Sequence, residues 1–222
     1  MPQHVAFVIM ARYPIVGSVK TRLARTIGAE RACLVYQAFL RDLDDRFARR
    51  SRALIWAFHP PESNFPSLVA PGTRCVPQVG QGLGARMHGC FRLLGAEGFD
   101  KVILIGADVP HVREQWLDEA EAALDSADVV LGPTADGGYY LIAMREPHDI
   151  FTGIEMSTPR VLAETLATAA AARLRVHLVP PTFDVDDADD LARLRELLAA
   201  DGCKPQLPHT AALLKSWGGD IV

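Results

Sequence analysis

The sequence lacks paired cysteines and long apolar runs. None of its four cysteines belongs to a C-x-x-C pair, so neither a zinc knuckle nor a redox pair is indicated. We expect reduced, mostly buried thiols at Cys33, Cys75, Cys90 and Cys203. The apolar run over residues 5–11 is far shorter than the roughly 20 residues of a membrane span, and the first four residues carry no basic cluster. The sequence therefore predicts a cytoplasmic protein without a membrane span.

An excess of positive charge is also missing. Lys and Arg number 23 against 27 Asp and Glu, a formal net charge of −4 over 222 residues. Proteins that coat nucleic acids show a basic face, so a nucleic-acid partner is not expected. With 49% hydrophobic and 23% charged residues, the chain lies well away from the composition of disordered proteins. It is predicted to fold.

Short apolar runs alternate with amphipathic stretches along the chain, as in βαβ units around a mostly parallel sheet. Continuous apolar runs predict central strands at residues 5–10, 53–58, 101–105 and 128–131. More mixed runs predict peripheral or antiparallel strands at residues 74–77, 139–144 and 175–179. Apolar spacing and capping residues predict helices over residues 30–49, 83–94, 113–126, 159–172 and 188–200. The fold class is α/β, three-layered, with a mostly parallel mixed sheet.

No repeat, linker or low-complexity boundary divides the chain. We expect a single domain over residues 1–200, because a length of this order fits one large α/β unit. Residues 201–222 are expected to form a C-terminal tail with a short helix at 211–217.

The loop after the first strand carries three cations. Arg12 begins it, a turn at Gly17 follows, and Lys20 and Arg22 stand two residues apart. Such a loop can wrap a pyrophosphate through guanidinium, ammonium and backbone contacts. The alternative is a solvated basic loop, and no Walker A pattern is present. We expect Lys20 and Arg22 to lie on a solvent-facing loop edge and to act on phosphate and not on folding.

A second loop, residues 78–87, has three glycines in five positions before a predicted helix. Glycines such as Gly82 and Gly84 let a backbone approach a flat ligand closely. Gln78 or Gln81 would add amide contacts to a base or ribose, and Arg86 would face phosphate. A flexible turn is the other interpretation.

Asp108 follows the most apolar strand of the sequence, in Gly-Ala-Asp-Val-Pro. A carboxylate at the end of a strand is well placed to hold a hard divalent cation, Mg²⁺ or Mn²⁺, that bridges phosphate oxygens. A turn or helix-capping aspartate is the alternative, which Pro110 supports.

Further carboxylates follow. Asp136 precedes two glycines, Gly137 and Gly138, and predicts either a turn or a catalytic carboxylate facing a sugar or acceptor. Asp184 and Asp186 would share one face of a strand because they are two residues apart. Asp186 is the expected partner of Asp108 in holding the metal. The next acidic residues, Asp187, Asp189 and Asp190, are predicted to open a helix.

Five motifs occur in a fixed order: V-K-T-R-L at 19–23, L-G-x-R-M at 83–87, G-x-D-x-P at 106–110, G-P-x-x-D-G-G-Y-Y-L-I at 132–142 and D-V-D-x-x-x-D-L at 184–191. In this combination the chain resembles a bacterial glycosyltransferase-like family of the nucleotide-diphospho-sugar transferase superfamily. That family is also described as radical-SAM/selenodomain-associated or arsenosugar-type transferases. More distantly, the chain is similar to guanylyltransferases of the phospholactate and molybdopterin type. The match runs from about residue 5 to residue 191.

The resemblance implies a GT-A fold, a nucleotide-binding first half and a divalent cation at Asp108. Lys20 and Arg22 fall on its phosphate loop. Its sugar or acceptor segment would include the following residues: Asp136, Gly137, Gly138, Tyr139, Ser157 and Thr158. The sequence departs from the family pattern at Gly82 and Ala85, where acidic residues are usual, and at Met156, where tryptophan is common.

Three function classes follow. A metal-dependent glycosyltransferase would use a nucleotide sugar and a small-molecule acceptor. A nucleotidyltransferase would transfer NMP from an NTP to a phosphorylated acceptor, with the same cation and basic loop stabilising the leaving pyrophosphate. A catalytically silent nucleotide-binding partner of another enzyme is the third. The motif loops hold no concentration of basic residues beyond those already named, Arg12, Lys20, Arg22 and Arg86, which favours the nucleotide sugar. A homodimer is compatible with each.

Overall fold

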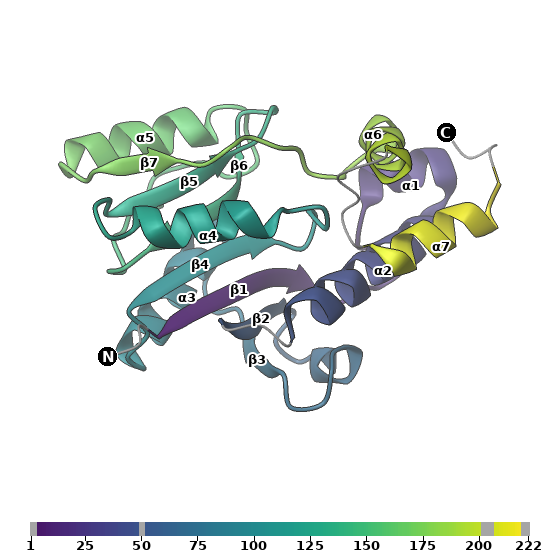
Figure 1. The fold of residues 1–222 in the computed structure, drawn as a ribbon, viewed down its shortest axis with the longest axis horizontal. Coiled ribbons are helices and arrows are strands. Elements are labelled where there is room, and N and C mark those ends of the chain that lie inside the picture. The colour runs from purple at the N-terminus through teal and green to yellow at the C-terminus, as the bar shows by residue number, and fades with distance from the viewer. Residues whose placement is uncertain (1–3, 49–51, 201–206, 219–222) are drawn as a thin grey trace.

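The computed structural model describes residues 4–48, 52–200 and 207–218. Within them a seven-stranded sheet has the order β3-β2-β1-β4-β6-β5-β7 (Figure 1). The strands are β1 (Val5–Arg12), β2 (Ala53–His59), β3 (Arg74–Pro77), β4 (Lys101–Gly106), β5 (Val129–Pro133), β6 (Tyr139–Met144) and β7 (Val176–Leu178). The four continuous apolar runs are interior strands, as predicted.

Most pairings in the sheet are parallel. Strand β1 pairs in parallel with β2 and β4, and β2 pairs in parallel with β3. Strand β6 runs antiparallel to both β4 and β5, while β7 adds a parallel edge to β5. The mixed run at 139–144 was predicted to be peripheral or antiparallel. It is antiparallel, but it lies inside the sheet, where residues 140–144 are buried on both faces.

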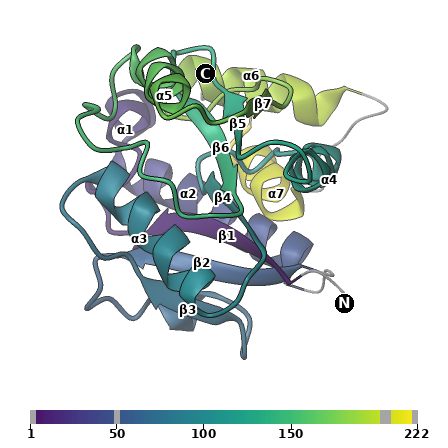
Figure 2. The same ribbon diagram turned by 90° about the vertical axis from the view of Figure 1, so that its left-hand side faces the viewer.

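Helices cover both faces, which gives three layers. They are α1 (Thr21–Ile27), α2 (Ala29–Phe47), α3 (Leu83–Ala96), α4 (Glu114–Ala123), α5 (Val161–Ala171), α6 (Ala188–Ala199) and α7 (Pro208–Ser216), with a short 3-10 helix η1 (Phe65–Leu68). One buried core joins the sheet to α1, α2, α4, α6 and α7, and the other joins it to α3 and α5. Figure 2 shows α3 and α5 on one side of the sheet and α4 and α7 on the other.

Local sequence explains several helix boundaries. Asp187 caps α6 by accepting from the backbone N–H of Asp190, and the Asp190 carboxylate accepts from the Asp187 N–H in return. This capping box is what the acidic cluster predicts. The predicted helix at 159–172 begins later, at Val161, since the residues before it form a turn, and the Leu162 N–H in its first turn donates to the Gly137 carbonyl.

The C-terminal helix α7 packs beside α2 (Figure 1). Asp42 of α2 is fully buried and accepts from the backbone N–H groups of His209 and Thr210 and from the Thr210 hydroxyl. These donors begin α7, so one carboxylate fixes the helix start. Residues 201–206 and 219–222 of the predicted tail lie outside the described residues.

Two smaller expectations concern cysteines and membranes. Cys33 and Cys90 are buried free thiols and Cys75 is a partly buried one, as predicted, while Cys203 lies outside the described residues. Among the helices of the described ranges, none is long and apolar enough to cross a membrane.

Candidate functional site

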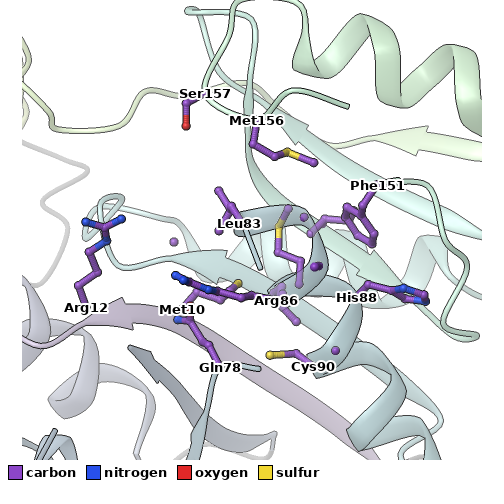
Figure 3. Close-up of a pocket in the computed structure, with 18 of the residues that line it drawn as sticks. Met10, Arg12, Gln78, Leu83, Arg86, His88, Cys90, Phe151, Met156 and Ser157 are labelled. Carbon is purple, nitrogen blue, oxygen red and sulfur yellow. The ribbon is translucent and has the colours of Figure 1, made fainter. Parts of the chain in front are cut away.

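A cleft of about 1630 Å³ opens at the carboxyl ends of β1, β3 and β4. Ligands of open α/β sheets bind at this edge, because the strands end there and the loops that follow them converge. The cleft walls come from the loop after β1, the glycine-rich loop before α3, the loop after β4 and the segment 151–157. Figure 3 shows side chains from several of these segments projecting into one space.

Most residues predicted for nucleotide, phosphate and metal do line this cleft. They are Arg12, Lys20, Arg22, Gln78, Gly82, Gly84, Arg86, Asp108 and Asp186. Gly17 is not part of the lining. It has a φ of 81°, so it serves the turn that leads to Lys20. Of the predicted sugar or acceptor residues, Tyr139 and Ser157 line the cleft, whereas Asp136, Gly137, Gly138 and Thr158 do not.

Three arginines of the cleft, Arg12, Arg86 and Arg92, have no carboxylate partner among the described residues. Arg12 ends β1, where its backbone N–H donates to the Tyr36 hydroxyl at 2.9 Å. Arg86 lies in the first turn of α3, and its Nε donates to the Gly80 carbonyl at 3.2 Å. Burial of the His59 ring is the largest cause of its lowered pKa, and the charges of Arg86 and Arg12 lower that pKa further. The two guanidinium groups therefore act on the same region. Their terminal guanidinium nitrogens remain open to a ligand (Figure 3).

Lys20 corrects the expectation of a solvent-facing basic loop. Its side chain is only 2% exposed, and its ammonium contacts Asp108 Oδ1 and, at 3.0 Å, Asp186 Oδ1. Burial alone would lower the pKa of Lys20, but the two carboxylates more than offset it and the pKa is raised. The prediction was wrong because Lys20 meets both partners only once β1 pairs with β4 and Leu23 bonds to the Asp186 carbonyl.

Arg22 does lie at the surface, as predicted, with its side chain 56% exposed. Its guanidinium contacts Asp186 Oδ2, so the two oxygens of Asp186 are held by two different cations. Although burial opposes it, these cations keep the pKa of Asp186 below its usual range. Asp186 is therefore ionised and fixed in direction.

Asp184 is a cleft residue that the predicted site did not include. Burial, then the carboxylates of Asp108, Asp186 and Asp136, raise its pKa to about 7. The predicted strand at 184–186 is absent: the chain there has no regular structure, and Val185 bonds to the Asp108 carbonyl at 2.9 Å. The alternation still holds, since Val185 is buried while its neighbours face the cleft.

Asp108 and Asp186 could supply some, but not all, of the ligands of a divalent cation. Mg²⁺ is commonly held by one or two carboxylates together with substrate phosphates. Here a positive group, the Lys20 ammonium, already stands between Asp108 and Asp186, as a bound cation would. Within the part of the chain that the structure describes, no three His, Cys, Asp or Glu side chains are grouped to hold a metal ion. The donor set is thus suited to a cation that arrives with further oxygen ligands.

The glycine-rich loop is more strongly anchored than a flexible turn. Gln78 is 7% exposed, and its Nε2 donates to the Ala11 carbonyl at 3.2 Å and to the Ala57 carbonyl at 2.7 Å. Both partners are acceptors, so the amide nitrogen must face them and only the amide oxygen is left for a ligand. The predicted amide contact to a base is therefore reduced to one acceptor.

Gly82 and Gly84, the two glycines predicted to let the backbone approach a ligand, differ. Gly82 has a φ of 85° and precedes α3, and a Cβ there would meet no atom within 4 Å. A Cβ on Gly84 would instead lie 2.9 Å from Met156 Cε and 3.1 Å from Phe151 Cβ. Gly84 therefore lets the segment 151–157 pack against α3. That segment supplies an apolar wall of the cleft through Phe151 and Met156 (Figure 3).

Asp136 closes its own turn. Its Oδ1 accepts from the Thr134 hydroxyl at 2.6 Å and from the Gly138 N–H at 3.2 Å. This is the Asx-type arrangement that the sequence left as an alternative. Gly137 has a φ of 89°, and a Cβ there would lie 2.0 Å from the Pro159 carbonyl oxygen. Asp136 nevertheless contributes to the raised pKa of Asp184, which places its charge at the margin of the cleft.

The comparisons with known proteins agree with this architecture. Residues 45–158, just over half of the chain, match a family described as "Uncharacterized protein conserved in bacteria (DUF2064)". No curated protein matches the chain. A solved structure from Desulfovibrio desulfuricans G20, provisionally described as a nucleotide-diphospho-sugar transferase, is 28% identical with a TM-score of 0.83. The match covers 97% of this chain and 98% of that chain.

Two more distant structures share the fold. A cytidylyltransferase from Leptospira borgpetersenii is 13% identical with a TM-score of 0.57, over 96% of this chain and 95% of that chain. CMP:2-keto-3-deoxy-manno-octonic acid synthetase in complex with CTP is 15% identical with a TM-score of 0.53, over 89% and 99%. The chain therefore belongs to the DUF2064 family and has the GT-A-like fold of the nucleotide-diphospho-sugar transferase superfamily, as the motifs implied.

Proposed function

We propose that the protein is a divalent-cation-dependent transferase that takes its donor group from a nucleoside-diphosphate sugar. The observation that carries the proposal is the charge arrangement of the cleft: Arg12 and Arg86 lack carboxylate partners, and Asp108 and Asp186 lie in the same cleft. A diphosphate with a bound cation needs both kinds of group. The similarity to the Desulfovibrio protein supports the same class.

In this proposal Arg12 and Arg86 bind the diphosphate. A guanidinium presents several donors in a fixed plane, which suits phosphate oxygens. Asp108 and Asp186 would hold Mg²⁺ or Mn²⁺, which when bound neutralises charge on the leaving diphosphate. Gln78 offers its amide oxygen to a donor group of the base or ribose.

The acceptor would enter along the wall formed by Phe151, Met156, Tyr139 and Ser157. Asp136 is the proposed base that removes the proton of the attacking hydroxyl. Its Oδ1 is held by the turn, which fixes the carboxylate and leaves Oδ2 without a hydrogen bond among the described residues. Asp136 borders the cleft but does not line it, so this role requires an acceptor that reaches its margin.

A nucleotidyltransferase is the second candidate. A triphosphate donor and a phosphorylated acceptor require more cations than a nucleotide sugar does. Arg92, on α3, also lines the cleft and would supply one of them. The two candidates differ in product: glycosyl transfer releases a nucleoside diphosphate, whereas nucleotidyl transfer releases pyrophosphate.

Calorimetry with a panel of nucleoside diphosphates, with and without Mn²⁺, tests the shared part of the proposal. We expect binding that requires Mn²⁺ and that weakens at least about tenfold in Asp108→Asn, because one carboxylate ligand is lost. Asp118→Asn, an exposed carboxylate of α4 paired with Arg52, is the matched control and should bind normally. Equal affinity in Asp108→Asn and the parent would overturn the metal assignment. Absence of binding by every nucleotide would overturn the function.

A further inference from the structure

The place where the proposed cation would bind is taken by a side chain of the protein itself. Lys20 Nζ contacts one oxygen of Asp108 and one oxygen of Asp186. We propose that Lys20 is a built-in counter-ion that makes divalent-cation binding conditional on the substrate's diphosphate. This inference rests on the proposed function and adds to it the order in which the ligands are held.

The surroundings keep the ammonium at this place. Its side chain is 2% exposed, and the ring centroids of Tyr36 and Phe39 lie 5.8 and 5.9 Å from Nζ. An ammonium removed from water needs its hydrogen bonds from the protein, and the two carboxylates provide them. The Lys20 backbone has a φ of 50°, in the left-handed region that non-glycine residues adopt only when the surroundings enforce it. Burial, the two carboxylates and the backbone conformation together hold the Lys20 ammonium in one position.

The carboxylates, in contrast, are open to the cleft. The side chains of Asp108 and Asp186 are 44% and 33% exposed. A ligand can reach them from the cleft, while Lys20 approaches from the protein interior. The proposed cation and the Lys20 ammonium thus share the same two carboxylates.

The charges in direct contact cancel. Asp108 and Asp186 contribute two negative charges, and Lys20 and Arg22 contribute two positive charges. These four side chains together are neutral, so a Mn²⁺ ion without diphosphate is attracted only weakly to them. A diphosphate changes this balance, because it adds negative charge and supplies further oxygen ligands.

Coupling of this kind is reciprocal. If diphosphate raises the affinity for Mn²⁺, Mn²⁺ raises the affinity for diphosphate by the same factor. Removing the Lys20 charge should uncouple the two ligands, since the carboxylates then attract Mn²⁺ without help. Replacing Lys20 by Arg keeps the charge and should keep the coupling.

Equilibrium dialysis of the full chain against Mn²⁺, alone and with inorganic pyrophosphate, measures this. We expect the parent to bind Mn²⁺ weakly alone and at least about tenfold more tightly with pyrophosphate. Lys20→Met, which fits among Tyr36 and Phe39, should bind Mn²⁺ alone at least about tenfold more tightly than the parent. Pyrophosphate should then add little, and Lys20→Arg should behave as the parent does.

Arg22→Met keeps the test decisive if Lys20→Met does not fold, because Arg22 is 56% exposed and its loss also leaves the carboxylates in excess. It should raise the Mn²⁺ affinity in the same direction. Equal affinity for Mn²⁺ alone in the parent and in whichever variants fold would overturn the inference, as would tight binding of Mn²⁺ by the parent without pyrophosphate. Failure of the proposed function looks different: no nucleotide binds, whatever the affinity for Mn²⁺.

Discussion

Two lysines with 2% exposed side chains mark opposite ends of the sheet, and their partners differ. Lys101 begins β4 and donates to the Glu121 carbonyl in the last turn of α4 at 2.8 Å and to Asp125 Oδ1, just after that helix, at 2.6 Å. Lys20 lies at the other end, between two carboxylates of the cleft. Lys101 is held by one carboxylate and one carbonyl of the fold, whereas Lys20 is held by two carboxylates that are open to the cleft, one of them shared with Arg22. The comparison sets a contact of the fold against the place where we propose a ligand site.

The largest expected effect breaks the structural tie. Lys101→Met should lower the free energy of unfolding by about 3 kcal/mol, because it removes two hydrogen bonds from a charged donor that is buried against α4. Urea unfolding followed by circular dichroism measures the loss. Nucleotide and Mn²⁺ binding, measured below the transition, should not change. A binding defect in this variant would remove the distinction between the two lysines.

At the cleft end, Asp136→Asn should keep the fold and lose catalysis. The Asn oxygen can still accept from Thr134 and Gly138, so the turn persists. A neutral amide cannot take a proton, and transfer to an acceptor should fall on the order of a hundredfold, or about 2.7 kcal/mol. Product release assays, with nucleotide affinity and melting temperature as controls, measure this. Undiminished transfer would assign Asp136 to the turn alone.

His111 is a third buried titratable residue, and it links the loop after β4 to Thr182. Its Nε2 lies 3.0 Å from the Thr182 hydroxyl. Burial, with help from Arg193, Arg46 and Arg113, lowers its pKa to about 3. The folded state therefore disfavours the proton that the unfolded chain accepts near pH 6.5.

The sign follows from that difference. The stability contributed by neutral His111 is present above about pH 6.5 and is lost as the pH falls toward 3. Between pH 7 and pH 5 the free energy of unfolding should fall by about 2 kcal/mol more in the parent than in His111→Gln, whose amide can still bond to Thr182. Paired urea titrations at the two pH values decide it. Parallel loss in both proteins would mean that other groups control acid stability.

The smallest expected effect belongs to Arg22. Arg22→Ala should leave the free energy of unfolding within about ±0.5 kcal/mol, as for most surface substitutions. Turnover should fall about tenfold, or about 1.4 kcal/mol, because a charged contact near the diphosphate is lost. Steady-state kinetics with a matched melting curve measure both. An unchanged turnover would make Arg22 a solvated loop residue.

The sheet could be predicted because its strands are short apolar runs, such as 5–10 and 101–105, whose burial needs no distant partner to be foreseen. The helix start at Asp187 could be predicted for the same local reason. The burial of Lys20 could not, because it depends on Asp108 and Asp186, far along the chain. The wall formed by Phe151 and Met156 likewise has no local signature, since the packing at Gly84 creates it.

The close packing at Gly84 and Gly137 has a consequence for how such a protein could diversify. Segment 151–159 is fixed at one end where Met156 and Phe151 press on Gly84, and at the other where Pro159 presses on Gly137. Between Phe151 and Met156, Thr152, Gly153 and Glu155 are exposed. Substitutions there can accumulate by drift or by laboratory selection without unseating either anchor. Variation in the exposed part of this cleft wall, which includes Thr152 and Gly153, is thereby separated in heritable terms from the residues that anchor the segment.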